Sequence, residues 1–254
     1  WASLAGTGNF ALVAGNSTVN QGTFSGTISG TGSLTKAAGG TLVLTLTANL
    51  EVGNVAVCAL AKNETGTTTT DGIGQFTSAT DDSGGNTWIE AVDWCEMGTS
   101  TAQDGACVAI YCTRADAQIN SGQIIAVTVA ASPIAKAGTC WEFTAPGTTI
   151  TQALGGNSNA TSPTPGMSVA TTASREHLFF RAQAGESNIT TWTAGSGFTP
   201  CTNATADPTP ATSTDGMGAR CDFKIETIDT SSTDSPTYGT FDQAGTMLGL
   251  DQDP

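Results

Sequence analysis

The sequence predicts an all-β protein, built as an antiparallel sandwich of two sheets with an extended N-terminal arm. Three observations carry this prediction. Charged residues make up only 12% of the 254 residues, while threonine, serine, glycine, alanine and asparagine are abundant. Thr and Val favour extended backbone, and Gly, Asn and Pro favour turns. No window shows a helical period, and short apolar or alternating segments recur between turn signals. Hydrophobic residues reach 38%, enough for a packed core.

Residues 1–46 form the predicted arm, because they place single apolar residues among small polar ones. In residues 22–36, Phe24, Ile28 and Leu34 have the same parity and would share one face of an extended chain. The pattern of residues 22–44 resembles a short repeat of bacterial β-solenoid adhesins of the autotransporter type. Only one such repeat is clear, whereas a solenoid needs several. An extended arm or a short shaft is therefore expected.

Residues 47–254 are predicted to form the sandwich domain, because the strand signals strengthen from residue 42 onward. The largely apolar run at 52–60 suits a central strand, and residues 154–166, rich in Asn, Ser and Pro, are expected to form a long loop. Each half-buried sheet needs a facing partner, which gives the two-sheet arrangement. Strands are expected at residues 42–46, 52–60, 76–80, 88–95, 107–114, 123–130, 134–143, 178–182, 190–193, 218–228 and 240–250.

Four motifs occur in the order found in a family of tailed-phage structural β-sandwich domains. They are EVGNVAV at 51–57, TDDSGGNTW at 80–88, VAIYC at 108–112 and TWTAGSGFT at 191–199. Together they resemble that family over residues 47–250, with one extra Asp in the second motif. The resemblance implies a jelly-roll-like sandwich at the surface of a virion or its appendages, and it brings no catalytic residues with it.

The charge of the chain excludes some partners. The formal net charge is −14, which repels nucleic-acid backbones and anionic membranes. No apolar run approaches the 18 or so residues needed to span a bilayer. The chain begins at Trp1, so we expect either a processed N-terminus or a fragment of a longer protein.

We expect no catalytic residues. His177 could act as a general base, but it is the only histidine, and no nucleophile motif accompanies it. A zinc site is disfavoured for a related reason, because none of the cysteines forms a CxxC pair.

A pair of glycosidase carboxylates is harder to exclude from sequence. Glu90, Asp93 and Glu96 lie close in sequence to Trp88 and Trp94, and sugar sites often combine carboxylates with aromatic rings. The simpler interpretation is that these acids are solvated groups at a strand edge, and we favour it.

A calcium site is the clearest ligand hypothesis. Asp81, Asp82 and Asn86 offer oxygen ligands within one turn, as hard cations require. The same residues are also those of an ordinary Asx-rich hairpin turn. No other cofactor is expected.

The seven cysteines leave an odd thiol. Cys95 and Cys107 flank one loop, Cys201 and Cys221 flank another, and residues on opposite sides of a hairpin can come close enough to bridge. Each pair is a candidate disulfide, with free thiols as the alternative. Cys58 and Cys112 lie within apolar strands, where a buried free thiol is the simple expectation.

Two of the five tryptophans lie beside turns and are candidate platforms for stacking a glycan, namely Trp88 and Trp192. Tryptophans at such positions more often cover the end of a core, with the indole N–H bonded to a loop carbonyl. Both alternatives stay open at this point.

Together these features predict a non-enzymatic structural protein of a bacteriophage virion, such as a capsid decoration, head-fibre or tail-fibre subunit. Its expected location is the virion surface, outside the cell. Its expected partners are other capsid or tail proteins, further copies in a symmetric homo-oligomer such as a trimer, and a glycan of the host surface. Neither nucleic acid nor a membrane is expected as a partner. The alternative function is a secreted bacterial adhesin or carbohydrate-binding module, and a glycan-degrading enzyme is the third.

Overall fold

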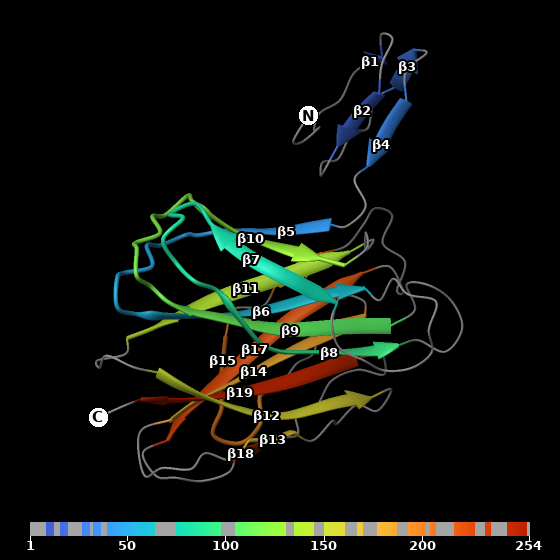
Figure 1. Ribbon diagram of the computed structural model, residues 1–254. Coiled ribbons are helices and arrows are strands. Elements are labelled where there is room, and N and C mark those ends of the chain that lie inside the picture. The colour runs from blue at the N-terminus through green and yellow to red at the C-terminus, as the bar shows by residue number, and fades with distance from the viewer. Residues whose placement is uncertain are drawn as a thin grey trace.

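The computed structural model is all-β in the residues that it describes, which confirms the predicted fold class at that level (Figure 1). The larger sheets are antiparallel. The described residues are 9–12, 16–19, 27–30, 33–36, 40–63, 75–97, 105–130, 135–144, 150–160, 167–169, 177–186, 193–201, 204–206, 216–226, 232–234 and 243–252.

Three sheets hold most of the strands. The first sheet has the order β5 (Gly40–Thr45), β10 (Ile124–Val129), β7 (Phe76–Asp81). The second has the order β11 (Lys136–Phe143), β6 (Val55–Asn63), β9 (Gly105–Arg114), β8 (Ile89–Met97). The third has the order β12 (Ile150–Ala160), β19 (Gln243–Gln252), β14 (His177–Glu186), β17 (Met217–Glu226), β15 (Thr199–Pro200), and β16 (Ala204–Ala206) also pairs with β17.

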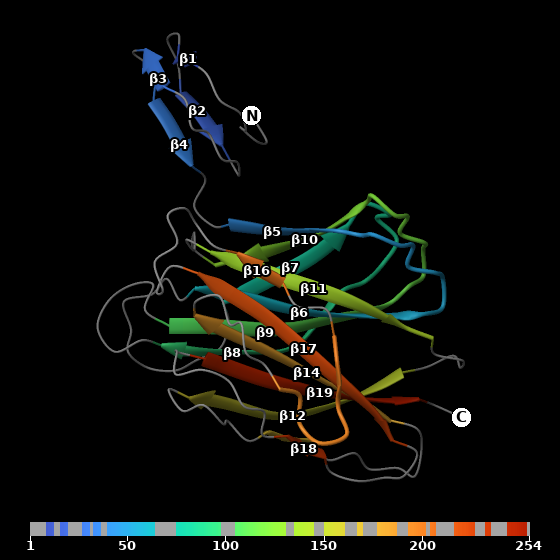
Figure 2. The same ribbon diagram turned by 180° about the vertical axis from the view of Figure 1, so that it is seen from behind.

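The second sheet lies between the other two and is buried on both faces (Figures 1 and 2). Along β6, Val57 and Ala59 pack into a cluster shared with the third sheet, whereas Cys58 and Leu60 pack into a cluster shared with the first. Successive side chains of a strand point to opposite faces, so one apolar strand serves two cores. The sequence predicted two sheets, and the structure has three stacked ones.

The third sheet carries polar side chains on the face turned away from the second. The guanidinium of Arg181 on β14 donates to the carboxylate of Asp222, its register partner on β17, and both side chains are fully buried. Gln183 Nε2 donates to Gln243 Oε1 at 2.8 Å. The guanidinium carbon of Arg181 lies 5.8 Å from the ring centroid of Phe198. This face is therefore a buried polar layer.

Two predicted segments differ from the structure. Residues 154–166 were expected to be a loop, but β12 runs through residue 160 and pairs with β19, with a register shift between Gly155 and Asn157. An edge strand can be rich in Gly, Asn and Ser when the backbone ladder holds it, so composition misled the prediction. The predicted strand at 190–193 lies outside the described residues except for Thr193.

The strands before the first sheet pair in parallel. Asn9 of β1 (Asn9–Leu12) pairs with Thr27 of β3 (Thr27–Gly30), and Asn16 of β2 (Asn16–Val19) pairs with Ser33 of β4 (Ser33–Lys36). The paired residues lie 18 and 17 positions apart in the sequence. Figures 1 and 2 show β1–β4 apart from the three sheets, beyond the start of β5. A further short pair joins β13 (Met167–Val169) to β18 (Ser232–Asp234).

Candidate functional site

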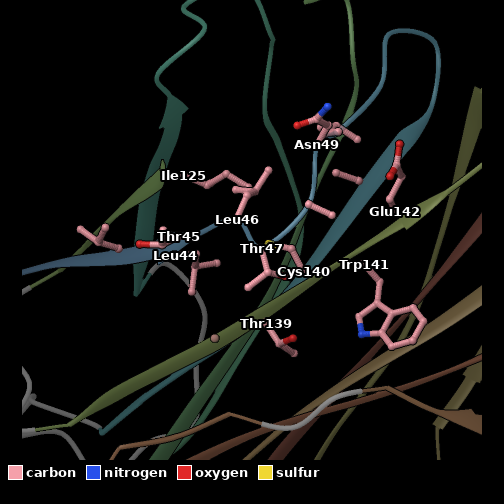
Figure 3. Close-up of a pocket in the computed structure, with 15 residues that line it drawn as sticks. Leu44, Thr45, Leu46, Thr47, Asn49, Ile125, Thr139, Cys140, Trp141 and Glu142 are labelled. Carbon is pink, nitrogen blue, oxygen red and sulfur yellow. The ribbon is translucent and has the colours of Figure 1, made fainter. Parts of the chain in front are cut away.

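A groove opens between the first and second sheets, beside the edge strands β5 and β11 (Figure 3). Its volume is about 670 Å³, within the range of ligand-binding pockets. It is lined by β5 and the segment after it, by β11, and by one residue each of β6 and β10. The lining residues are Val43, Leu44, Thr45, Leu46, Thr47, Ala48, Asn49, Leu50, Ala56, Ile125, Gly138, Thr139, Cys140, Trp141 and Glu142.

The walls of the groove are apolar where the two sheets meet. Leu44 and Leu46 are partly buried and pack against the cluster between the first and second sheets, to which Ile125 belongs. Gly138 leaves room for the neighbouring leucines, because a Cβ at this position would lie 3.0 Å from Cδ2 of Leu44 and of Leu60. The Trp141 ring projects from the opposite side of β11, toward the third sheet (Figure 3).

Two residues that line the groove are held in place by hydrogen bonds to residues outside it. Leu46 N donates to Gln123 O at 2.9 Å and ties the segment after β5 to the first sheet. Glu142 Oε1 accepts from Glu51 N at 2.9 Å and from Asn54 Nδ2 at 2.6 Å, so β11 holds the loop between β5 and β6 in place. These bonds leave the groove preformed, which lowers the entropic cost of binding. One signal in the sequence could have located the groove, namely Gly138 inside a strand, since such a glycine can mark a close backbone approach.

The predicted calcium ligands form a hydrogen-bonded turn. Asp81 Oδ1 accepts from Ser83 N at 2.9 Å and from the Ser83 hydroxyl, and its Oδ2 accepts from Trp88 Nε1 at 2.7 Å. Asn86 Oδ1 accepts from the backbone of residues 116 and 117. Asp82 Oδ2 instead accepts from Ile124 N at 3.0 Å. Donors therefore already occupy oxygens that a cation would need, and calcium binding stays a prediction.

Replacing Asp81 by asparagine should cost about 1–2 kcal/mol of unfolding free energy, because the new amide cannot accept every donor and one becomes unpaired. Burial raises the pKa of Asp81, but hydrogen bonds from Ser83, Trp88 and Asn86 outweigh it and leave a net lowering. A lowered carboxyl pKa stabilises the fold above the unfolded pKa of about 3.9, and this gain disappears as pH falls below it. Urea unfolding at several pH values measures the difference. A calcium-induced rise in Tm that the variant lacks would instead establish a cation site.

The glycosidase candidates are only partly brought together. An extra residue at Ala91 shifts the register of β8, so that Glu90 and Asp93 face the first sheet together. Glu96 pairs with Ala106, which belongs to the cluster on the opposite face. Tyr111 Oη donates to Glu90 Oε2 at 2.6 Å. The result is a pair of carboxyl groups, with Glu90 partly buried and Asp93 buried, while Glu96 lies on the other face of the sheet.

The pKa of Glu90 is raised, first by burial and then by the Asp93 carboxylate, although the Tyr111 hydrogen bond opposes the rise. A raised carboxyl pKa means that the folded state holds its proton more tightly than the unfolded state. Stability should therefore fall as pH rises from about 4.3 through the folded pKa. Glu90→Gln should remove this decline while keeping an acceptor for Tyr111. Thermal unfolding of both proteins between acid and neutral pH measures it, and parallel pH profiles would contradict it.

The remaining candidate residues lie apart. His177 is fully buried at the start of β14, with its ring centroid 6.2 Å from that of Phe179. Trp88 and Trp94 are partly buried and pack against different clusters, so they form no common platform. Trp192 lies outside the described residues.

Six of the seven cysteines form disulfides. Cys95 is joined to Cys107 across β8 and β9, and Cys201 is joined to Cys221 beside β17, with Cα separations of 4.0 Å and 5.2 Å. Cys58, which the sequence suggested as a buried thiol, is joined to Cys140 between β6 and β11. The sequence did not suggest this pair, because 82 positions separate the two residues. The Cys58–Cys140 bond lies at the wall of the groove, since Cys140 lines it.

Thiol titration has a definite expected result. Burial raises the pKa of the remaining Cys112 thiol to about 11, so it should not react in the folded protein at neutral pH. We expect no reactive thiol in the folded protein, one after denaturation without reductant, and seven after denaturation with reductant. Three or more thiols in the denatured, unreduced protein would show that at least one pair is not joined.

Neither a protein-family model nor a curated protein nor a solved structure matches the chain. Within the described residues, no group of three or more His, Cys, Asp or Glu side chains is arranged to hold a metal ion. The described part of the chain also has no helix of the length and hydropathy needed to cross a membrane.

Proposed function

We propose that the chain is a non-enzymatic structural protein exposed outside the cell, on the surface of a bacteriophage virion as a capsid decoration, head-fibre or tail-fibre subunit. The observation that carries the extracellular part is the presence of three disulfides, one in each of three separate places in the fold. Disulfides persist in oxidising surroundings, which include the surfaces of cells and virions.

Two further features support a structural role. The second sheet is buried on both faces, so the body is a rigid block rather than a hinged one. The first and second sheets also end in a preformed groove that is mainly apolar and suited to binding. In this proposal the three sheets elaborate a jelly-roll-like sandwich, and residues 1–46 serve as the arm that contacts neighbouring subunits.

A secreted bacterial adhesin or carbohydrate-binding module is the second candidate. The parallel pairing of β1 with β3 and of β2 with β4 favours it, because near-constant spacing is the register of a solenoid shaft. In that case the sheets would form the binding head, and β1–β4 would belong to the stalk.

Fractionation separates the two candidates. Mass spectrometry and electron cryo-microscopy of purified phage particles should find the chain at the particle surface. Its absence from every particle fraction would reject the virion proposal, and recovery from the surface or medium of uninfected bacteria would support the adhesin. A glycan array then tests the binding module, with Trp88→Ala as the variant that should lose binding if this ring is the platform.

A further inference from the structure

The groove lies beside two strand edges that lack a partner among the described strands. β5 pairs only with β10, and β11 pairs only with β6, so each presents one unpaired edge. Unpaired edges accept an added strand through backbone hydrogen bonds, and alternate side chains of that strand enter whatever pocket adjoins. The pocket here offers the partly exposed Leu44 and Leu46. An extended segment with apolar residues at alternate positions fits this site.

Charge indicates which segment that is. All 22 acidic residues follow residue 50, so residues 1–50 carry one cation, Lys36, and no anion. The rest of the chain has 22 acidic and seven basic residues, a net charge of −15. Electrostatic repulsion therefore opposes contact between residues 51–254 of two copies. It does not oppose contact between residues 51–254 of one copy and the arm of another. Glu142 lines the groove and Glu51 adjoins it, which suits a cation on the incoming strand.

The arm also has the required form. Phe24, Ile28 and Leu34 alternate with small polar residues, and β4 pairs only with β2 among the described strands. β4 can therefore add to another edge without losing its present pairing. The arm leads into the body at Gly40, and Figures 1 and 2 show β1–β4 extending away from the three sheets rather than along β5 and β11. The groove is therefore open to the arm of a second copy.

We propose that the groove between β5 and β11 binds the N-terminal arm of a second copy of this chain, as a strand added to an open edge. Leu34 of β4 fills the pocket formed by Leu44, Leu46 and Ile125, and Lys36, two positions further along the same strand, meets Glu142. Because arm and groove are different surfaces, the contact is head-to-tail and yields rings or filaments. The inference rests on the proposed structural function and names the contact through which the subunits assemble.

The oligomeric state of the 254-residue chain tests the inference. Size-exclusion chromatography with light scattering measures it over a broad concentration range. The native chain should form species that grow with concentration. Leu46→Asp in the groove and Leu34→Asp in the arm should each weaken assembly by about thirtyfold or more, as loss of a central interface anchor does. Mixed in equal amounts, the two variants should form a dimer and nothing larger. The intact arm of Leu46→Asp can bind the intact groove of Leu34→Asp, and no other intact pair remains.

Ile89→Asp is the matched control, since Ile89 is an exposed apolar residue of β8, far from the groove strands in the sheet order. It should assemble like the native chain.

A photo-crosslinker at Thr139, used with a mixture of isotope-labelled and unlabelled protein, should capture residues 24–36 of another copy. A monomeric native chain, or capture only within one copy, would overturn the inference, as would capture of another part of the body. Particle fractionation does not depend on the groove, so failure of the proposed function is detected separately.

Discussion

Replacing Arg181 by methionine should cost about 3–5 kcal/mol of unfolding free energy, because it leaves the Asp222 carboxylate buried without its ion-pair partner. Both side chains are fully buried on the outer face of the third sheet, where β14 and β17 place them directly opposite. The loss should include the contact of the guanidinium with the Phe198 ring. Urea unfolding followed by tryptophan fluorescence measures the change.

The double variant Arg181→Met with Asp222→Leu separates the value of the pair from the cost of breaking it. Removing both charges abolishes the penalty of a buried carboxylate that has lost the Arg181 guanidinium, so the double variant should be markedly more stable than Arg181→Met. Lys224→Met is a suitable control, since the Lys224–Glu226 ion pair is partly exposed and should contribute no more than about 1 kcal/mol. Similar losses in all three variants would show that the buried pair has no special role.

Removing the Cys58–Cys140 disulfide by changing both residues to alanine should cost about 4–5 kcal/mol, because the bond closes a loop of 82 positions and restricts the unfolded chain. Urea unfolding of the oxidised proteins measures it. The bond also ties β11 to β6 beside the groove, so the variant should assemble more weakly through that groove.

Cys112→Ala is the control for burial alone, since Cys112 is buried but has no disulfide partner. It should cost much less than the double variant. An equal loss in both would mean that packing at the cysteine positions, rather than the crosslink, supplies the stability. Native protein kept in reductant should match the stability of a variant lacking all three disulfides.

Much of the sheet structure could be predicted, because local pattern determines it. The apolar runs near residues 55–63 and 105–114 became β6 and β9, the two central strands of the second sheet. Such continuous apolar runs are typical of strands covered on both faces, which was the available signal for a third sheet. The strand β12 was missed because its Gly, Asn and Ser residues owe their conformation to pairing with β19, a contact distant in sequence.

The candidate site was harder to predict, because it is made by non-local contacts. The groove joins residues near 45 to residues near 125 and 140, and none of these three segments has a functional motif. The Cys58–Cys140 pairing could not be deduced from spacing, since several connectivities are compatible with seven cysteines. Local turn chemistry was more informative. It placed Asp81, Asn86 and Trp88 in one turn, where the indole of Trp88 donates to Asp81.

The positions of the disulfides determine how the molecule carries tension. A pull between the two ends passes along the backbone to Cys58, crosses to Cys140, continues to Cys201 and crosses again to Cys221. The backbone from residue 58 to residue 140 is bypassed, and it contains β7, β8, β9 and β10 with most of β6 and β11. A load would therefore unravel β5 and the C-terminal strands first, while the middle of the stack bears no backbone strain. The protein can lengthen at its ends and still keep its central layer folded.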